Sequence, residues 1–154
     1  MQIETHRNRM TTDLLFTLRL LDHYPDLRLT GDLSHYVVGR EFWYPVTDED
    51  QALMHRIIDN CWGFHGRVAS REQTQLQLYF PQHQGWVKVF MGWRERGFRQ
   101  WKAKAGADET LTFLCELGPP EYAMTGADGY ELSDRWAESL QMKDGVRQLW
   151  QSLP

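Results

Sequence analysis

The sequence predicts an α/β fold in which short parallel strands alternate with helices. Short apolar or β-branched runs alternate along the chain with longer segments of helical periodicity, and no Asn-Gly or similar tight turn joins one run to the next. Such alternation is typical of a parallel sheet with helices packed over it. An acidic residue or a histidine also stands at the end of every predicted strand. Because the carboxyl ends of parallel strands lie at one edge of a sheet, these residues are expected to meet there.

The strands are expected at residues 1–5, 27–30, 61–64 and 110–115. The last of them, Thr-Leu-Thr-Phe-Leu-Cys, is almost entirely apolar or β-branched, so we expect it to be buried on both faces. Residues 36–45 are expected to form a loop with exposed aromatic side chains. Helices are expected after the strands: one capped by Thr11 or Thr12 and ending before Pro25, one capped by Thr47, one over 86–104, and one that begins at Leu132 or Ser133.

Composition limits the classes of function. At 154 residues the chain suits a single domain, residues 1–154. Its net charge of −4 and its pI of about 5.8 argue against a nucleic-acid partner, which normally needs a basic surface. One basic cluster alternates with aromatic residues at helical spacing, which predicts the solvated face of an amphipathic helix. This cluster comprises Arg94, Arg96, Arg99, Lys102 and Lys104.

The two cysteines and the hydropathy pattern indicate the compartment. Cys61 and Cys115 stand far apart, each among apolar residues, so we expect buried free thiols in a reducing environment. No apolar run approaches the roughly 18 residues that a membrane span needs. We therefore expect a cytoplasmic protein with no membrane partner.

A candidate metal site comes from the strand ends. Glu4, Asp32, His65 and Glu116 each stand at the end of a different predicted strand. In a parallel barrel these ends converge, and three carboxylates packed together without a counter-ion would repel one another. A divalent cation removes that conflict. Three oxygen donors and one nitrogen donor suit Mn²⁺, Mg²⁺, Co²⁺ or Zn²⁺, and ligand type alone does not choose among these metals.

Further polar residues flank the predicted ligands. His35 stands three residues after Asp32, and it could bind the metal, orient a ligand or contact a substrate hydroxyl. His6 follows Glu4 closely, with a structural role as the alternative. Arg67 and Arg71 follow His65, and their guanidinium groups suit an anionic or polyhydroxylated substrate, with a solvated surface position as the alternative.

Several other chemistries lack their motifs. The sequence contains no G-x-S-x-G, no phosphate-binding Walker loop and no G-x-G-x-x-G after a strand. Neither cysteine has a neighbouring base that would make it a nucleophile. These observations argue against serine or cysteine hydrolysis and against nucleotide or dinucleotide binding.

The strand-end segments resemble those of the xylose isomerase-like barrels, which include sugar phosphate isomerases/epimerases, ketose 3-epimerases and endonuclease IV-type enzymes. The resemblance spans nearly the whole chain, and the order and spacing of the segments make it specific. The segments are Ile3-Glu4-Thr5-His6, Gly31-Asp32-Leu33-Ser34-His35, Phe64-His65-Gly66-Arg67 with Arg71 beyond, and Cys115-Glu116-Leu117-Gly118-Pro119.

The resemblance implies both a fold and an activity. It implies the carboxyl-terminal half of a (β/α)8 TIM barrel, with Glu4, Asp32, His65 and Glu116 as ligands of one divalent metal. It implies a sugar or sugar phosphate substrate, isomerised or epimerised by proton transfer through a cis-enediolate, with Glu4 and Glu116 as catalytic acid and base. His35 and Arg71 resemble positions that hold the substrate, and Arg67 and His6 are further substrate-binding candidates.

The sequence also departs from this family. The additional histidines and carboxylates of a three-metal endonuclease are not evident, so cleavage of damaged DNA is the weaker alternative. Only four βα units are predicted, which suggests a truncated or fragment chain that lacks an amino-terminal half or pairs with a second copy. A non-catalytic remnant, or a module that binds a carbohydrate or metal without turnover, is the other alternative.

Overall fold

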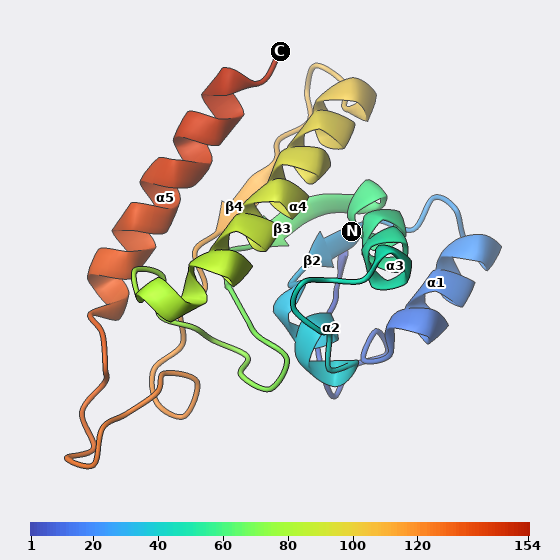
Figure 1. Cartoon of the computed structure of the whole chain (residues 1–154). Helices are drawn as coiled ribbons and strands as arrows, with labels where there is room; N and C mark the ends of the chain where they lie inside the picture. Colours follow the sequence, from blue (N-terminus) through green and yellow to red (C-terminus); the bar gives the residue numbers. More distant parts are fainter.

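A sheet of four parallel strands forms the centre of the computed structural model, which describes residues Met1–Pro154 (Figure 1). The strands lie in the order β1-β2-β3-β4, so each pairs with the strand that follows it in the chain. The predicted α/β class and the parallel sheet are confirmed. The strands are β1 (Ile3–Glu4), β2 (Leu29–Gly31), β3 (Cys61–His65) and β4 (Thr112–Leu114).

Five α-helices connect or follow the strands. No helix has both the length and the apolarity that crossing a membrane requires. A short 3₁₀ helix, η1 (Pro81–His83), leads directly into the longest α-helix. The α-helices are α1 (Leu14–His23), α2 (Ser34–Gly39), α3 (Asp48–Asp59), α4 (Gln84–Lys104) and α5 (Arg135–Ser152).

Helix starts follow local hydrogen bonding. The Thr47 side chain accepts a hydrogen bond from the amide of Asp50 and caps α3, as predicted. For α1 the predicted cap was wrong: Asp13, not Thr11 or Thr12, accepts from the amide of Phe16. The hydroxyl of Thr11 instead donates to the carbonyl of Glu4, so this threonine ties the end of β1 to the start of the following turn.

The hydrophobic core lies between the sheet and the helices. Leu29 of β2 and Phe64 of β3 are buried beneath Ile57 of α3 and Phe98 of α4. The rings of Phe64 and Phe98 meet edge to face, with centroids 5.6 Å apart, a favourable arrangement for aromatic pairs. This packing holds β3 against α4 and so fixes the position of His65, the last residue of β3.

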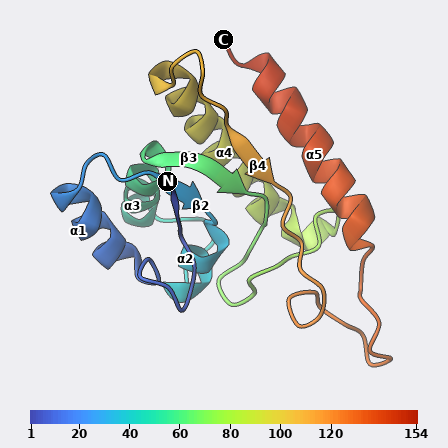
Figure 2. The ribbon, with the colours of Figure 1, turned by 180° about the vertical axis from the view of Figure 1, so that it is seen from behind.

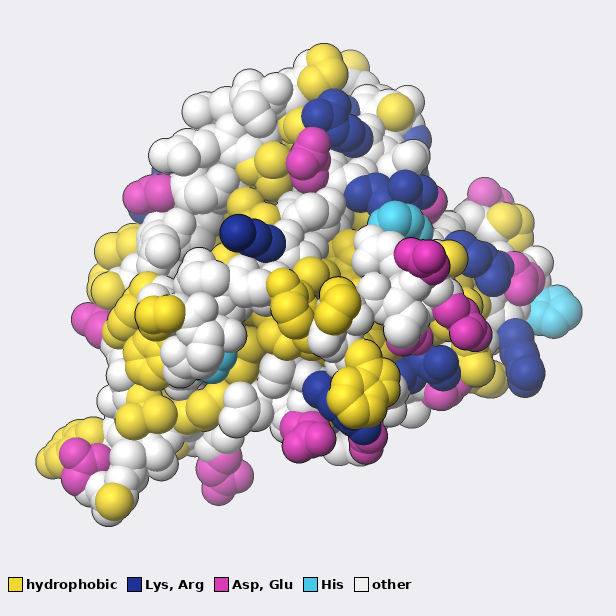
Figure 3. Space-filling view, in the orientation of Figure 1, with side chains coloured by type: hydrophobic (Ala, Val, Ile, Leu, Met, Phe, Trp, Pro, Cys, Tyr) yellow, Lys and Arg dark blue, Asp and Glu magenta, His cyan; other side chains and the backbone are white.

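Helices cover one face of the sheet and leave the other open. In Figure 2 strands β3 and β4 lie in front of α4, with no helix between them and the viewer. The helix-covered side, shown in Figure 3, carries interspersed hydrophobic and charged side chains. On the open face Gln2 and Thr112 are exposed and Thr30 is half-buried. The open face therefore gives solvent access to the carboxyl edge of the sheet.

The segment 36–45 differs from the predicted exposed loop. Its first part belongs to α2, and both Tyr36 and Phe42 are buried, whereas Trp43 and Tyr44 are exposed as expected. The Tyr36 hydroxyl donates to the hydroxyl of Thr17 on α1, so this side chain bridges two helices. The prediction was wrong because a partner so distant in sequence leaves no local signal.

The fourth strand also differs from prediction. It covers only Thr112–Leu114, and its central Phe113 is half-buried between exposed neighbours. It is an edge strand with one open face, so apolar and β-branched composition alone did not imply burial on both sides. Of the two free thiols, Cys61 is buried as predicted, whereas Cys115 is only half-buried.

The close approach of α4 to β3 can be tested at Gly97. A Cβ at this position would lie 2.3 Å from Cζ of Phe64 and 3.2 Å from Cγ2 of Ile58. We expect Gly97→Ala to lower the free energy of unfolding by about 1–3 kcal/mol, because overpacking outweighs the gain in helix propensity. Urea denaturation followed by circular dichroism measures the change.

Gly92 of the same helix provides a matched control. A Cβ there meets nothing within 4 Å, so Gly92→Ala should raise the free energy of unfolding by about 0.5–1 kcal/mol. Equal stability of the two variants would contradict the tight packing of α4 on β3.

Candidate metal centre

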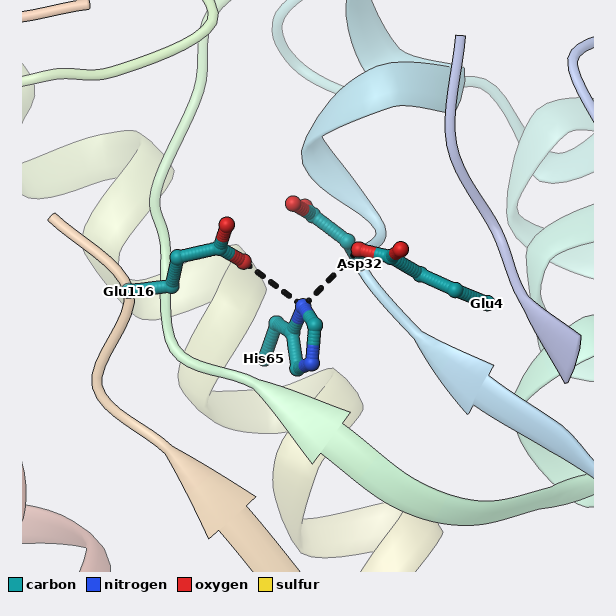
Figure 4. A group of neighbouring side chains, drawn as sticks. All are labelled: Glu4, Asp32, His65 and Glu116. Atoms are coloured by element: carbon teal, nitrogen blue, oxygen red, sulfur yellow. Dashed lines mark ion pairs between the residues drawn. The ribbon is translucent and has the colours of Figure 1, made fainter. Parts of the chain in front are cut away.

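The four predicted ligand residues meet at the carboxyl edge of the sheet. Glu4 and His65 are the last residues of β1 and β3. Asp32 directly follows β2, and Glu116 lies just beyond β4. Each residue offers one ligand atom, and these atoms all lie within 4.8 Å of one another (Figure 4). Strand pairing thus brings together side chains that are far apart in sequence.

Asp32 is the buried member of the group. Its Oδ1 accepts hydrogen bonds from the amide and the hydroxyl of Ser34, which fixes the orientation of the carboxylate. Its Oδ2 is buried, has no hydrogen-bond partner and lies 3.4 Å from Nε2 of His35. Burial by itself raises the pKa of Asp32, but His35 and the positive charge of Arg67 outweigh burial and hold the pKa below its usual range.

His65 lies between two carboxylates. Its Nδ1 is 2.6 Å from Oε2 of Glu116 and 3.2 Å from Oε1 of Glu4, the two ion pairs drawn in Figure 4. Burial lowers the pKa of this imidazole, but Glu116, Asp32 and Glu4 together raise it above its usual value. The charged form of His65 therefore contributes to charge balance at this edge.

Glu116 is held by a histidine and an arginine. Its contact with His65 lowers the pKa of Glu116, partial burial opposes this effect, and Arg67 lowers the pKa further. Nη2 of Arg67 lies 3.1 Å from Oε1 of Glu116 and 3.7 Å from Oδ2 of Asp32. A single buried guanidinium thus faces two of the three carboxylates.

Backbone bonds hold the strand ends in place. The amide of Thr5 donates to the carbonyl of Thr30, and its hydroxyl donates to the carbonyl of Asp32, which joins β1 to the residue after β2. Beyond β4, the side-chain amide of Gln75 donates to the carbonyl of Gly118 and accepts from the amide of the same residue. This reciprocal pair fixes the loop that carries Glu116.

The donor set fits a divalent cation. Oδ2 of Asp32, Nδ1 of His65 and Oε2 of Glu116 are buried and have no partner in hydrogen-bond geometry. The last two atoms nevertheless form the 2.6 Å ion pair described above, so it is Oδ2 of Asp32 that remains without a donor, an arrangement compatible with a bound cation. Oxygen donors with one imidazole nitrogen suit a divalent metal ion.

Three of the four predicted substrate-binding residues lie near this centre. His35 is buried beside Asp32, and its ring lies 4.0 Å, centroid to centroid, from that of the half-buried His6. Arg67 is buried, with its guanidinium against the carboxylates of Asp32 and Glu116 instead of open solvent.

The fourth residue, Arg71, contacts other partners. It pairs with Glu41 at 2.9 Å, and its guanidinium carbon lies 3.8 Å from the ring centroid of Trp43. The guanidinium of Arg71 thus contacts a carboxylate and an aromatic ring of the segment between α2 and α3, and not the four candidate metal ligands.

Three contributing residues were absent from the sequence-based set. Ser34 follows Asp32 at the spacing of an Asx turn, so its bonds to the carboxylate had a local signal. Gln75 and Tyr122 had none, because their partners lie far along the chain. The ring of Tyr122 lies 4.4 Å from the guanidinium carbon of Arg67 and covers it on one side.

Comparisons with known protein families, curated proteins and solved structures find no match for this chain. The chemistry of the side chains at this edge is therefore the basis on which a function is assigned.

The raised pKa of His65 predicts a pH-dependent contribution to stability in protein freed of metal by chelator. Protonated His65 should contribute its full share to the free energy of unfolding below pH 6.5, the usual pKa of histidine. This contribution should be lost as the pH rises through the raised pKa of His65. We expect His65→Gln to destabilise the protein more at pH 5.5 than at pH 9. Urea denaturation of both proteins at the two pH values measures this difference, and an equal effect at both would exclude charge pairing of His65.

Proposed function

We propose that this chain binds a divalent cation through Glu4, Asp32, His65 and Glu116 and isomerises or epimerises a sugar or sugar phosphate. The observation that carries the proposal is the convergence of these four side chains at the carboxyl edge of a parallel sheet, with one ligand atom of each within 4.8 Å of the others. The resemblance of the strand-end segments to xylose isomerase-like enzymes supports the reaction class. We further propose that the four strands correspond to the carboxyl-terminal half of a TIM barrel.

Burial separates the roles of the four residues. The side chain of Asp32 is fully buried and that of His65 is 16% exposed, so these two are suited to holding a cation. The side chains of Glu4 and Glu116 are 34% and 33% exposed, so they can also contact a substrate. A residue that moves a proton must reach the reacting carbon, which favours the two glutamates.

The two glutamates come from opposite edges of the sheet. Glu4 ends β1, and Glu116 follows β4, with β2 and β3 between them. A sugar lying across this edge would contact one carboxylate on each side, as proton removal by one and return by the other requires. When bound, the cation would polarise the sugar carbonyl and so acidify the adjacent C–H. The lowered pKa of Glu116 keeps this carboxylate ionised and able to accept a proton.

A binding module without turnover is the second candidate. The observation that favours it is the open face of the sheet, over which no helix packs (Figure 2). Enzymes of this reaction type gain from exclusion of water around the reacting groups. Metal binding is common to both candidates, whereas proton exchange into a substrate is specific to the enzyme.

Metal binding is tested by titrating Mn²⁺ into wild-type protein and into Glu116→Gln by isothermal titration calorimetry. Loss of a residue that only supports a metal ligand typically weakens binding 10- to 100-fold, so loss of a direct ligand should weaken it by at least about 100-fold. Because the raised pKa of His65 favours its protonated form, binding near pH 7 should also release protons and strengthen as pH rises.

The matched control for this titration is Glu95→Gln. Glu95 is an exposed carboxylate on α4 that pairs with Arg99, so its loss should leave Mn²⁺ affinity unchanged. Stoichiometric binding that survives Glu116→Gln would remove this residue from the ligand set.

Turnover is tested by incubating Mn²⁺-loaded protein with ketoses and ketose phosphates in D₂O. We expect deuterium at the carbon next to the carbonyl, detected by proton NMR, and we expect Glu4→Gln and Glu116→Gln to slow its incorporation by at least about 100-fold. Tight Mn²⁺ binding without any deuterium incorporation would favour the binding module.

A further inference from the structure

Arg94 of α4 is a buried cation away from the metal ligands. Its exposed fraction is only 3%, so the prediction that it belongs to the solvated face of α4 was wrong. Arg96 and Arg99 do lie toward solvent and pair with Asp59 and Glu95. Arg94 stands two and five residues before these arginines, which places it on a different face of α4, where it points to the interior.

The guanidinium of Arg94 lacks a counter-ion. No carboxylate lies within ion-pair distance of it, and its only oxygen acceptor is the carbonyl of Arg67, 2.9 Å from Nη2. Nη1 has only the sulfur of Met91 at 3.4 Å, which is a weak acceptor. Burial lowers the pKa of Arg94 to about 10, so the group remains charged at neutral pH.

Aromatic rings lie near this cation without neutralising it. The guanidinium carbon is 5.9 Å from the ring centroid of Phe90 and 5.6 Å from that of Phe113. Such contacts offset part of the desolvation cost of a cation but supply no negative charge. An unpaired buried charge costs several kcal/mol, so an anion at this position would be stabilising.

A cleft between α4 and α5 has Arg94 in its lining. Its volume is about 210 Å³, and Arg94 is the only charged residue in its lining. Cavities of roughly 150 Å³ accept a molecule the size of benzene, so this cleft has room for a small organic ligand. Hydrophobic side chains are exposed on the same side of the molecule in Figure 3. The apolar lining consists of Val68, Leu78, Val87, Met91 and Met142.

We propose that this cleft binds a small monocarboxylate with an apolar tail, whose carboxylate pairs with Arg94 and whose tail packs against Met91 and Met142. A guanidinium presents two parallel N–H donors that match one carboxylate group. Methionine side chains adapt to aliphatic or aromatic tails of different shape. The site is separate from the metal centre and does not depend on the proposed isomerase activity.

Hexanoate is the probe that combines both features. We expect it to bind the wild-type protein with a dissociation constant of about 0.1–1 mM, measured by calorimetry, and to shift the NMR methyl signals of Met91 and Met142. Acetate, which lacks the tail, and hexan-1-ol, which lacks the charge, should each bind at least about 10-fold more weakly.

Two variants test separately the charge of Arg94 and the volume of the cleft. Arg94→Met removes the cation and keeps an apolar side chain, so it should fold, as circular dichroism will show, and bind hexanoate at least about 10-fold more weakly. Gly145→Leu fills the cleft from α5 and leaves Arg94 in place. A Cβ at Gly145 meets nothing within 4 Å, so this substitution should be tolerated and should abolish hexanoate binding.

Gly92→Leu is the matched control, because Gly92 also tolerates a side chain but does not line the cleft. It should bind hexanoate like the wild-type protein. The proposal is overturned if the wild-type protein does not bind hexanoate at 10 mM, or if Arg94→Met or Gly145→Leu binds it as tightly as wild type. Hexan-1-ol binding as tight as that of hexanoate would also overturn it, since the cleft would then be apolar only.

Discussion

Charge balance at the carboxyl edge of the sheet is the constraint on which the rest of the site depends. Three carboxylates approach one another there, and two of them face the buried guanidinium of Arg67 while His65 lies between Glu4 and Glu116. Like charges this close destabilise a fold unless cations accompany them. The basic groups supply part of that compensation, and a divalent cation bound by the four side chains, as proposed above, would supply the remainder.

The sequence was informative about most of the local structure, although it gave the wrong cap for α1. The cap of α3 was predicted from a threonine followed by acidic residues. The parallel sheet and the meeting of Glu4 with Glu116 were predicted from short apolar runs that end in an acidic residue or a histidine. Tertiary contacts were not predictable in this way. Tyr36 is buried in the hydrophobic core with its hydroxyl bonded to Thr17, and β4 is half-exposed because it lies at the edge of the sheet.

The burial of the arginines shows most clearly that tertiary contacts were hard to predict from the sequence. Arg67, which follows β3, and Arg94 of α4 are buried, whereas Arg96 and Arg99 of the same helix are more exposed. The two buried guanidinium groups also serve different purposes. That of Arg67 compensates carboxylates, whereas that of Arg94 donates to the Arg67 carbonyl and has no counter-ion. Residue type gives no information about such differences, whereas the spacing of Arg94 from the buried Phe90 and Phe98 of α4 does place it on the face that packs against the sheet.

The reciprocal bonds between Gln75 and Gly118 restrict which residue position 75 can hold. Its buried side chain must donate to a carbonyl and accept from an amide at the same time. A carboxylate has no donor when ionised, and a shorter asparagine spans less distance. Most substitutions at position 75 would therefore break the bonds to Gly118, although Gln75 contacts none of the four candidate ligand residues. Sequence variation at this position is limited because these bonds hold the segment that carries Glu116.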